Sequence, residues 1–371
     1  MPCEVLSEKD NMNIIFLVFT PAQLMNAIIL AKEAFSYESC DLLYDEKSMG
    51  SFSTVIANSG VFQNAYMRRP DPSFPHDTPV HALRAVREYA SAFQGMVDFF
   101  PFDPLHYDRA FISGVNLWNF QHYYAMKEKN PNLSLSVYEE GICEYYTLGL
   151  PVNIPRFAFS RIFCHHYYLS ECDSLYAHCP DVVRNRWRNI KVKRIPPVSD
   201  SVRDILNYVF TYRPTQLEMD EGQAIFLEQR YFNENLEQRQ REWISRFAES
   251  LPPGRFKIKL HPASAPNKYD ESYPVLRVTS PMEIIAMNED ISSSVFFTIN
   301  SSAAVNLRLM SRWRSNIAML YRLDSENVPP YLDDLFRRVQ NQPSDGNFWI
   351  PKNEEELSEI LKFITDSIGT S

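Results

Sequence analysis

The chain has 371 residues, of which 45% are hydrophobic and 13% aromatic. This length predicts two domains, and this apolar content excludes a globally disordered chain. The net charge of −9 argues against a nucleic-acid-binding protein, which normally carries a basic excess, but it leaves a small anionic substrate open.

The six cysteines show neither a CxxC pair nor a zinc-ligand spacing, so we expect reduced thiols in a cytosolic protein. The apolar run at residues 14–19 is far shorter than the about 20 residues that a membrane span needs. The start of the chain also lacks the pattern of a secretory signal. We therefore expect a cytoplasmic protein, with or without peripheral contact with the inner face of a membrane.

The first half begins with the pattern of a strand, a tight loop and a helix. Residues 13–19 form an apolar run, Thr20 is a good N-cap, and Pro21 fits the first helical position. Strand-type and helix-type segments then alternate. The further strands are predicted at 41–44, 109–114 and 133–138, and the helices at 52–56, 81–94 and 118–128. This order predicts a parallel sheet with crossover helices.

A change of composition separates the two halves. Residues 150–168 are rich in prolines, aromatic residues and arginines, and a basic run follows from Arg184 to Arg194. The basic-aromatic region 156–194 suits a lid over an acceptor site or a membrane-surface patch, but a solvated face or a domain-packing loop is the simpler interpretation. Residues 196–220 are interpreted as a linker that contains one helix, 201–208.

The second half repeats the alternation. Strands are predicted at 224–227, 256–260, 275–278, 295–299 and 317–320, and helices at 233–251, at 281–287, from Ser302 onward and at 354–368. The simplest architecture is α/β, with two Rossmann-like domains facing one another. The predicted domains are residues 12–195 and 221–350, followed by a closing helical segment, 351–371.

Glu139-Glu140-Gly141 directly follows the predicted strand 133–138. Two adjacent carboxylates raise one another's pKa when partly removed from water, which suits a general base. The glycine permits a sharp turn after the pair. An ordinary solvated turn explains the same residues, so both interpretations stay open.

His261-Pro262 and Asn300-Ser301-Ser302 follow two strands of the second half. Open α/β sheets bind ligands beyond the carboxyl ends of their strands, and a helix that begins at a serine pair attracts anions. These residues therefore predict a phosphate site. The alternatives are a core or capping histidine and simple N-capping serines.

Glu283 lies in the first turn of a predicted helix. It suits either a capping box with Ser280 or a carboxylate that binds two ribose hydroxyls. The chain contains no GxGxxG, Walker, HExxH, GxSxG or DxD motif, which argues against dinucleotide redox chemistry, ATP hydrolysis and metal-dependent sugar transfer.

In this order, Glu139-Glu140-Gly141, His261-Pro262 and Ser301-Ser302 resemble three motifs of the bacterial sialyltransferases that build capsules and lipooligosaccharides. Those motifs are an acidic-acidic-glycine motif, an HP motif and a paired Ser/Thr motif. Residues 19–27 are also similar to the start of the polysialyltransferase-type and lipooligosaccharide sialyltransferase families. The resemblance covers nearly the whole chain but not residues 150–214.

The resemblance implies a GT-B fold, in which two Rossmann-like domains face each other across a cleft. It implies that residues 12–195 form the acceptor side and that residues 221–350 bind the donor, CMP-sialic acid. Sialic acid would be transferred to a hydroxyl of a glycan acceptor with inversion, without a metal or other cofactor, in bacterial surface polysaccharide or lipooligosaccharide synthesis.

The resemblance also implies roles for individual residues. Glu139 would be the base and Glu140 its supporting carboxylate, although the exchange of these two roles is open. His261 would protonate or stabilise the departing CMP phosphate. The implied substrate-binding residues are Thr20, Gln23, Gly141, Pro262, Glu283 (ribose), Ser301 and Ser302 (phosphate).

Two rival interpretations remain at this point. One is another GT-B glycosyltransferase that uses Kdo or a different nucleotide sugar. The other is a non-catalytic glycan- or nucleotide-binding protein on the same scaffold. The acceptor sugar, the linkage, the number of sugars added and the oligomeric state are left open by the sequence.

Overall fold

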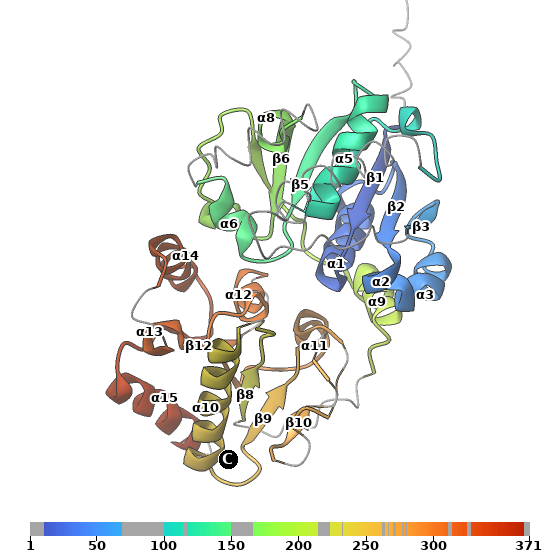
Figure 1. Cartoon of the computed structure of the whole chain (residues 1–371). Coiled ribbons are helices and arrows are strands. Elements are labelled where there is room, and N and C mark those ends of the chain that lie inside the picture. Colours follow the sequence, from blue (N-terminus) through green and yellow to red (C-terminus); the bar gives the residue numbers. More distant parts are fainter. Residues whose placement is uncertain are drawn as a thin grey trace, which may run out of the picture. The chain divides into compact units, whose positions relative to one another are not determined.

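The computed structural model describes residues 11–68, 100–113, 117–149, 166–213, 223–231, 233–261, 264–265, 267–269, 272–276, 278, 280–310, 314–324 and 328–366 (Figure 1). The chain forms two compact units, Met1–Val209 and Phe210–Ser371, called here the first and the second domain. The boundary between them falls inside the segment that the sequence suggests as a linker.

The first domain contains a seven-stranded sheet with the strand order β3-β2-β1-β4-β5-β6-β7 (Figure 1). Its strands are β1 (Asn13–Val18), β2 (Ser39–Asp45), β3 (Ala65–Arg68), β4 (Arg109–Ser113), β5 (Ser134–Tyr138), β6 (Cys172–Ala177) and β7 (Lys191–Arg194). All neighbouring strands run parallel. The order reverses between β1 and β4, and such a switch point is where open α/β sheets bind ligands.

Helices connect these strands. They are α1 (Pro21–Ile29), which continues as a π-helical turn (Leu30–Ala34), α2 (Glu46–Met49), α3 (Ser53–Asn58), α5 (Leu117–Lys129), α6 (Cys143–Thr147), α8 (Tyr168–Glu171) and α9 (Asp200–Val209). Short 3-10 turns lie at Gly50–Phe52, Pro104–His106 and Pro180–Val182. Thr20 caps α1 by accepting a hydrogen bond from the backbone of Gln23, and Pro21 is its first residue, as the sequence predicts.

The core of the first sheet follows from its apolar strands. All residues from Ile14 to Val18 are fully buried, as expected for the centre of a parallel sheet with both faces covered. Phe16 stacks on Phe111 of the neighbouring strand β4, with ring centroids 4.8 Å apart. The hydroxyl of Tyr138, at the end of β5, donates to the carbonyl of Leu17. The ring contact joins β1 to β4 and the hydrogen bond joins β5 to β1, three strands whose carboxyl ends lead to candidate residues.

The second domain contains a six-stranded sheet with the order β10-β9-β8-β11-β12-β13. Its strands are β8 (Ala224–Leu227), β9 (Phe256–Lys259), β10 (Val275–Leu276), β11 (Val295–Thr298), β12 (Asn316–Met319) and β13 (Phe348–Trp349). All pairs are parallel, and the order reverses between β8 and β11. Both domains are therefore Rossmann-like.

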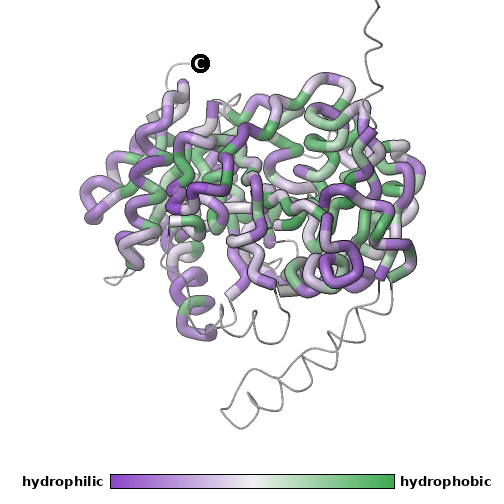
Figure 2. The backbone as a smooth tube through the Cα atoms, turned by 90° about the horizontal axis from the view of Figure 1, so that it is seen from above, coloured by the Kyte–Doolittle hydropathy of each residue, from purple (hydrophilic) through white to green (hydrophobic). Residues whose placement is uncertain are grey.

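The helices of the second domain are α10 (Glu234–Ser250), α11 (Met282–Asn288), α12 (Ser302–Leu309), α13 (Tyr321–Asp324), α14 (Pro330–Gln340) and α15 (Glu354–Asp366). Phe247 of α10 packs against Phe297 of β11, with ring centroids 4.5 Å apart. In Figure 2 the helical backbone changes between hydrophobic and hydrophilic along its length, as expected for helices with one buried face. Among the described helices, none is long and apolar enough to span a membrane.

Most predicted elements are confirmed to within a few residues. The predicted helix 81–94 and Gly114 lie outside the described residues. The sequence prediction missed the strands β3, β6, β7 and β13 and the helices α2, α6, α8, α13 and α14. The alternation of apolar and basic residues at 256–260 predicts a half-buried strand, but Lys259 at the end of β9 is only 7% exposed. Strand β9 lies between β8 and β10, so both of its edges are paired.

Candidate active site

Four polar side chains meet at the carboxyl edge of the first sheet, beside the switch point. Thr20 and Gln23 follow β1, Ser113 ends β4, and Glu140 follows β5. Parallel strands place these positions at one edge because each strand ends there.

Glu140 is held by three hydrogen-bond donors. Its Oε1 accepts from the Thr20 hydroxyl at 2.8 Å, and its Oε2 accepts from Gln23 Nε2 at 2.6 Å and from the Ser113 hydroxyl at 2.9 Å. The amide of Gln23 is oriented because its oxygen accepts from the backbone of Phe19. Glu140 is partly exposed, so this carboxylate is both fixed and accessible.

Glu139 is fully buried, unlike its neighbour. Its Oε2 accepts from the Tyr145 hydroxyl at 2.5 Å and from the backbone N–H of His178 at 2.7 Å. Its backbone carbonyl accepts from Asn26 Nδ2 at 2.6 Å. Glu139 thus ties the loop after β5 to the start of α6, the end of β6 and helix α1.

His178 is also buried beneath this edge. Its Nε2 lies 3.0 Å from Asn26 Oδ1, and the orientation of that amide follows from the bond between Asn26 Nδ2 and the Glu139 carbonyl. His178 Nε2 is therefore the protonated nitrogen. Burial, together with the charge of Arg194, lowers the pKa of His178 to about 3, so the ring is neutral at pH 7.

Glu144, in the first turn of α6, is the third carboxyl group of the site and is 2% exposed. Its Oε1 lies 3.1 Å from the Ser113 hydroxyl, and its Oε2 accepts from the backbone N–H of Gly141 at 3.3 Å. Burial and the neighbouring Glu140 raise the pKa of Glu144 to about 7.

A second group of charged residues lies at the carboxyl edge of the second sheet. Glu228 directly follows β8, and its side chain is fully buried. It accepts from the backbone N–H of His261 at 2.9 Å and from Lys268 Nζ at 2.5 Å. Burial lowers the pKa of His261 from its usual value, although the charge of Glu228 opposes this shift. Glu228 thus anchors the loop that carries His261.

The start of helix α12 follows β11 at the same edge. The Ser301 side chain caps the helix by accepting from the backbone N–H of Ala303 at 3.3 Å, and Ser302 is the first helical residue. The simple N-capping interpretation of Ser301 is therefore correct, and it is compatible with anion binding at the same helix end. The preceding Asn300 accepts from the Tyr231 hydroxyl at 3.2 Å.

Glu283 and Lys259 lie next to this edge in the interior. Glu283, 5% exposed, accepts from Asn306 Nδ2 of α12 at 2.9 Å, and burial raises its pKa. The capping-box interpretation of Glu283 is wrong, because α11 has Pro281 as its N-cap and the Ser280 hydroxyl donates to the Phe210 carbonyl instead. Burial lowers the pKa of Lys259 to about 8, and the charges of Glu283 and Glu228 oppose this shift.

No protein-family model matches the chain, and no curated protein matches its sequence. Among the similar solved structures, TcCGT1 in complex with UDP has a TM-score of 0.56 and 9% sequence identity, with 95% of this chain and 90% of that chain covered. UGT89C1 of Arabidopsis thaliana complexed with UDP-L-rhamnose has a TM-score of 0.54 and 9% identity, with 97% of this chain and 92% of that chain covered. The α/β-galactoside α-2,3-sialyltransferase of the luminous marine bacterium Photobacterium phosphoreum has a TM-score of 0.51 and 11% identity, with 92% of this chain and 99% of that chain covered. The chain has the GT-B fold. This confirms the fold class predicted from the sequence, and identities this low establish the fold alone.

Within the GT-B domains, the predicted residues fall into two groups. The first domain brings together Thr20, Gln23, Glu139, Glu140 and Gly141, and the second holds His261, Glu283, Ser301 and Ser302. Pro262 lies outside the described residues. Sequence reasoning missed Asn26, Ser113, Glu144, Tyr145, His178, Glu228 and Lys259. The only signal for Ser113 was its place at a strand end, and Glu144 stands only five residues beyond Glu139.

The described part of the chain contains no group of three or more His, Cys, Asp or Glu residues that could hold a metal ion. The predicted basic-aromatic region is described only from residue 166 onward. There Arg184, Arg186, Arg188, Lys191, Lys193 and Arg194 are exposed. Lys193 donates to the Tyr176 hydroxyl and Arg194 to the His178 carbonyl. Contact with a membrane through this region stays a prediction.

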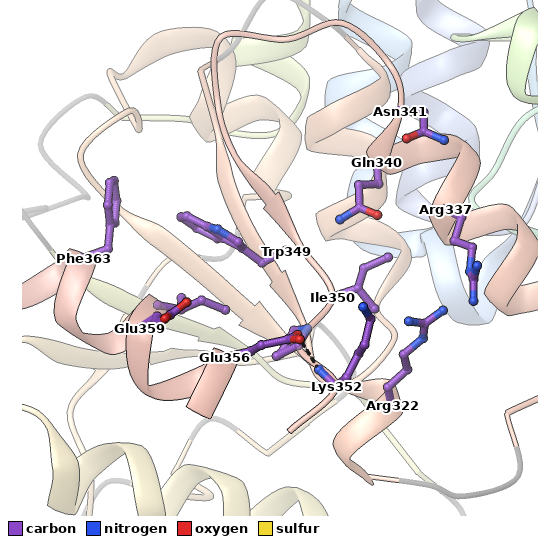
Figure 3. Close-up of a pocket in the computed structure, with 12 residues that line it drawn as sticks. Arg322, Arg337, Gln340, Asn341, Trp349, Ile350, Lys352, Glu356, Glu359 and Phe363 are labelled. Carbon is purple, nitrogen blue, oxygen red and sulfur yellow. Dashed lines mark hydrogen bonds between the residues drawn. The ribbon is translucent and has the colours of Figure 1, made fainter. Parts of the chain in front are cut away.

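A pocket of about 730 Å³ lies elsewhere in the second domain, between α13, α14, β13 and α15 (Figure 3). Its lining combines aromatic side chains with groups of both charges, including Trp349, Phe363, Arg322, Lys352 and Glu356. None of the residues predicted from the sequence lines it. The candidate residues of each domain therefore lie at its own sheet edge and not in this pocket.

Proposed function

We propose that the chain is a sialyltransferase that moves sialic acid from CMP-sialic acid to a hydroxyl of a glycan acceptor. The observation that carries this proposal is the placement of the three motifs. Glu139-Glu140 directly follows β5, His261 follows β9 by two residues, and Ser301-Ser302 begins three residues after β11, each at the carboxyl edge of its own Rossmann-like sheet. Their order along the chain matches that of the resembling family, and a GT-B sialyltransferase is among the similar structures.

Glu140 is the better candidate for the base. It is partly exposed and fixed by three donors, whereas Glu139 is fully buried and accepts from Tyr145 and His178. In the proposed reaction Glu140 takes the proton of the acceptor hydroxyl while that oxygen attacks the anomeric carbon. Glu139 supports the loop from below. The roles expected from the resemblance are thereby exchanged, an option that the sequence left open.

The leaving group is the proposed task of the second domain. As the bond from the anomeric carbon to the CMP phosphate breaks, negative charge grows on the phosphate. His261 would stabilise this charge by hydrogen bonding or proton transfer, and the N-terminus of α12 with Ser301 and Ser302 would bind the phosphate oxygens. The imidazole of His261 is neutral at pH 7 without ligand because burial lowers its pKa. A bound phosphate would favour the protonated ring.

A single displacement of this kind inverts the anomeric centre and leaves no covalent intermediate on the protein. Glu283 is proposed to bind the ribose, through a change of its present hydrogen bond to Asn306. Thr20 and Gln23 bind Glu140, so we propose that they act on the acceptor through this carboxylate.

A second candidate is a glycosyltransferase that uses a UDP-sugar, because TcCGT1 and UGT89C1 were solved with UDP or UDP-L-rhamnose. Nucleotide selectivity separates the two candidates. A ligand at about 100 times its dissociation constant stabilises the folded state by about 2.7 kcal/mol. In a thermal-shift titration the proposal predicts that CMP protects the protein at far lower concentrations than UDP or GDP. Equal or stronger protection by UDP would favour the second candidate.

A further inference from the structure

The hydroxyl of Ser113 lies between two carboxyl groups. Its oxygen is 2.9 Å from Glu140 Oε2 and 3.1 Å from Glu144 Oε1. A hydroxyl has one proton to donate, and an ionised carboxylate can only accept. If both glutamates were ionised, one of these two contacts would bring two acceptors together. One further proton, on either carboxyl group, would give each of the two contacts its own donor.

The surroundings show which carboxyl group holds this proton. Both oxygens of Glu140 already face donors, namely Thr20 on Oε1 and Gln23 on Oε2. Glu144 is 2% exposed, whereas Glu140 is partly exposed. The Glu144 carboxyl group also faces backbone N–H groups, those of Gly141, Glu140 and Glu144, and Oε1 is the oxygen directed at Ser113. A proton on Glu144 Oε1 satisfies every contact in this chain of hydrogen bonds.

We propose that protonated Glu144 donates to Ser113, which in turn donates to Glu140, so that Glu144 is a positioning residue for the base. This inference rests on the proposed function, in which Glu140 accepts the acceptor proton. With Glu144 protonated, the Ser113 hydroxyl always donates to Glu140 and holds its carboxylate in one orientation. When Glu144 ionises, Ser113 faces two acceptors, and its hydrogen bond to Glu140 weakens while those from Thr20 and Gln23 remain.

The remaining neighbours do not compete for this proton near pH 7. Burial raises the pKa of Cys143 to about 11, so its thiol is protonated. Burial also raises the pKa of Tyr138, whose hydroxyl donates to the Leu17 carbonyl. Among the described residues, Glu140 is a charged group that faces Glu144, and burial together with its charge raises the pKa of Glu144. We expect the positioning to weaken as the pH rises through about 7.

The test compares Glu144→Gln with Glu144→Ala. The glutamine amide can donate to Ser113 at any pH, whereas alanine cannot donate. We expect the kcat of the wild type to fall as the pH rises through about 7, and the kcat of Glu144→Gln to lack this fall. Glu144→Ala should lose about tenfold to a hundredfold in kcat across the pH range, because the base is misplaced. The exposed Glu242→Gln in the second domain is the matched control for a charge change elsewhere.

Two outcomes would overturn the inference: a Glu144→Gln variant with the pH profile of the wild type, or one as inactive as Glu144→Ala. Infrared difference spectroscopy provides a readout that does not depend on turnover. The protonated-carboxyl band that Glu144→Gln removes should be present in the wild type at pH 6, disappear near pH 7 and shift in Ser113→Ala. Absence of this band at pH 6 would refute the protonated Glu144. If the band is present but no variant or wild type transfers sialic acid, the proposed function fails and the location of the proton stands.

Discussion

The two adjacent glutamates should respond in opposite ways to the same substitution. Glu140→Gln keeps the shape of the side chain but removes the proton acceptor, and its amide N–H₂ must face one of the donors Thr20, Gln23 or Ser113. Loss of a general base lowers the rate by about 10²- to 10⁴-fold. We expect this loss in kcat, with little change in the melting temperature because the side chain is partly exposed.

Glu139→Gln should mainly affect stability. Its buried carboxylate accepts from Tyr145 and His178, and a hydrogen bond to a charged group contributes about 1.5–3 kcal/mol. For a domain of this size about 1 kcal/mol changes the melting temperature by about 2–4 °C. Weakening one of these two hydrogen bonds should therefore lower the melting temperature by about 3–12 °C.

Both variants can be measured by initial rates of CMP release and by differential scanning calorimetry. Rates would be compared at a temperature where both variants are folded. A Glu140→Gln variant with wild-type kcat, or a Glu139→Gln variant that is as stable as the wild type but inactive, would refute the assignment of the base.

Three further predictions concern the buried charges. The pKa of His178 is lowered to about 3 in the folded state, against about 6.5 unfolded, so the unfolded state binds more protons below pH 6.5 and stability falls as the pH drops. In denaturant unfolding, the free energy of unfolding of the first domain should fall by about 2 kcal/mol from pH 6.5 to 5, and His178→Gln should lack this fall. The same dependence of the unfolding free energy on pH in wild type and variant would contradict this. Glu228→Ala should destabilise the second domain by about 3 kcal/mol, because it leaves the His261 N–H and Lys268 without this acceptor. Glu228→Gln should destabilise it less, and equal unfolding free energies for the two variants would argue against the anchor role. The ring of His261 should titrate by NMR below its usual pKa in the free protein and higher with CMP bound, and a value that CMP does not change would exclude a phosphate contact.

Apolar runs were sufficient to predict the central strands. The run at β1 and the strands β5 and β11 are buried on both faces and bounded by polar residues, so their ends could be located and the candidate residues with them. Strand β7 was missed because it is an edge strand of exposed Lys and Arg, a composition that protects sheet edges and resembles a loop. Strand β6 contains Asp173 and Ser174, which bond to Ser136 and interrupt any apolar pattern.

The partners of the candidate residues could not be predicted, for a different reason. Ser113, Glu144 and His178 come from β4, α6 and the end of β6, and only the strand order brings them together. Alternation along β9 predicts a half-buried strand, but Lys259 is buried. A local pattern records which residues can face a core, whereas the number of covered faces depends on strands distant in the sequence.

Transfer itself is the most direct test of the proposed function. The full-length protein would be incubated with CMP-sialic acid and a panel of galactose- and sialic-acid-terminated glycans, and the products weighed by mass spectrometry. The proposal predicts a product heavier by one or more sialic acid residues, formed by the wild type and strongly reduced in Glu140→Gln and His261→Ala. Transfer only from a UDP-sugar, or sialic acid transfer that both variants leave unchanged, would contradict it.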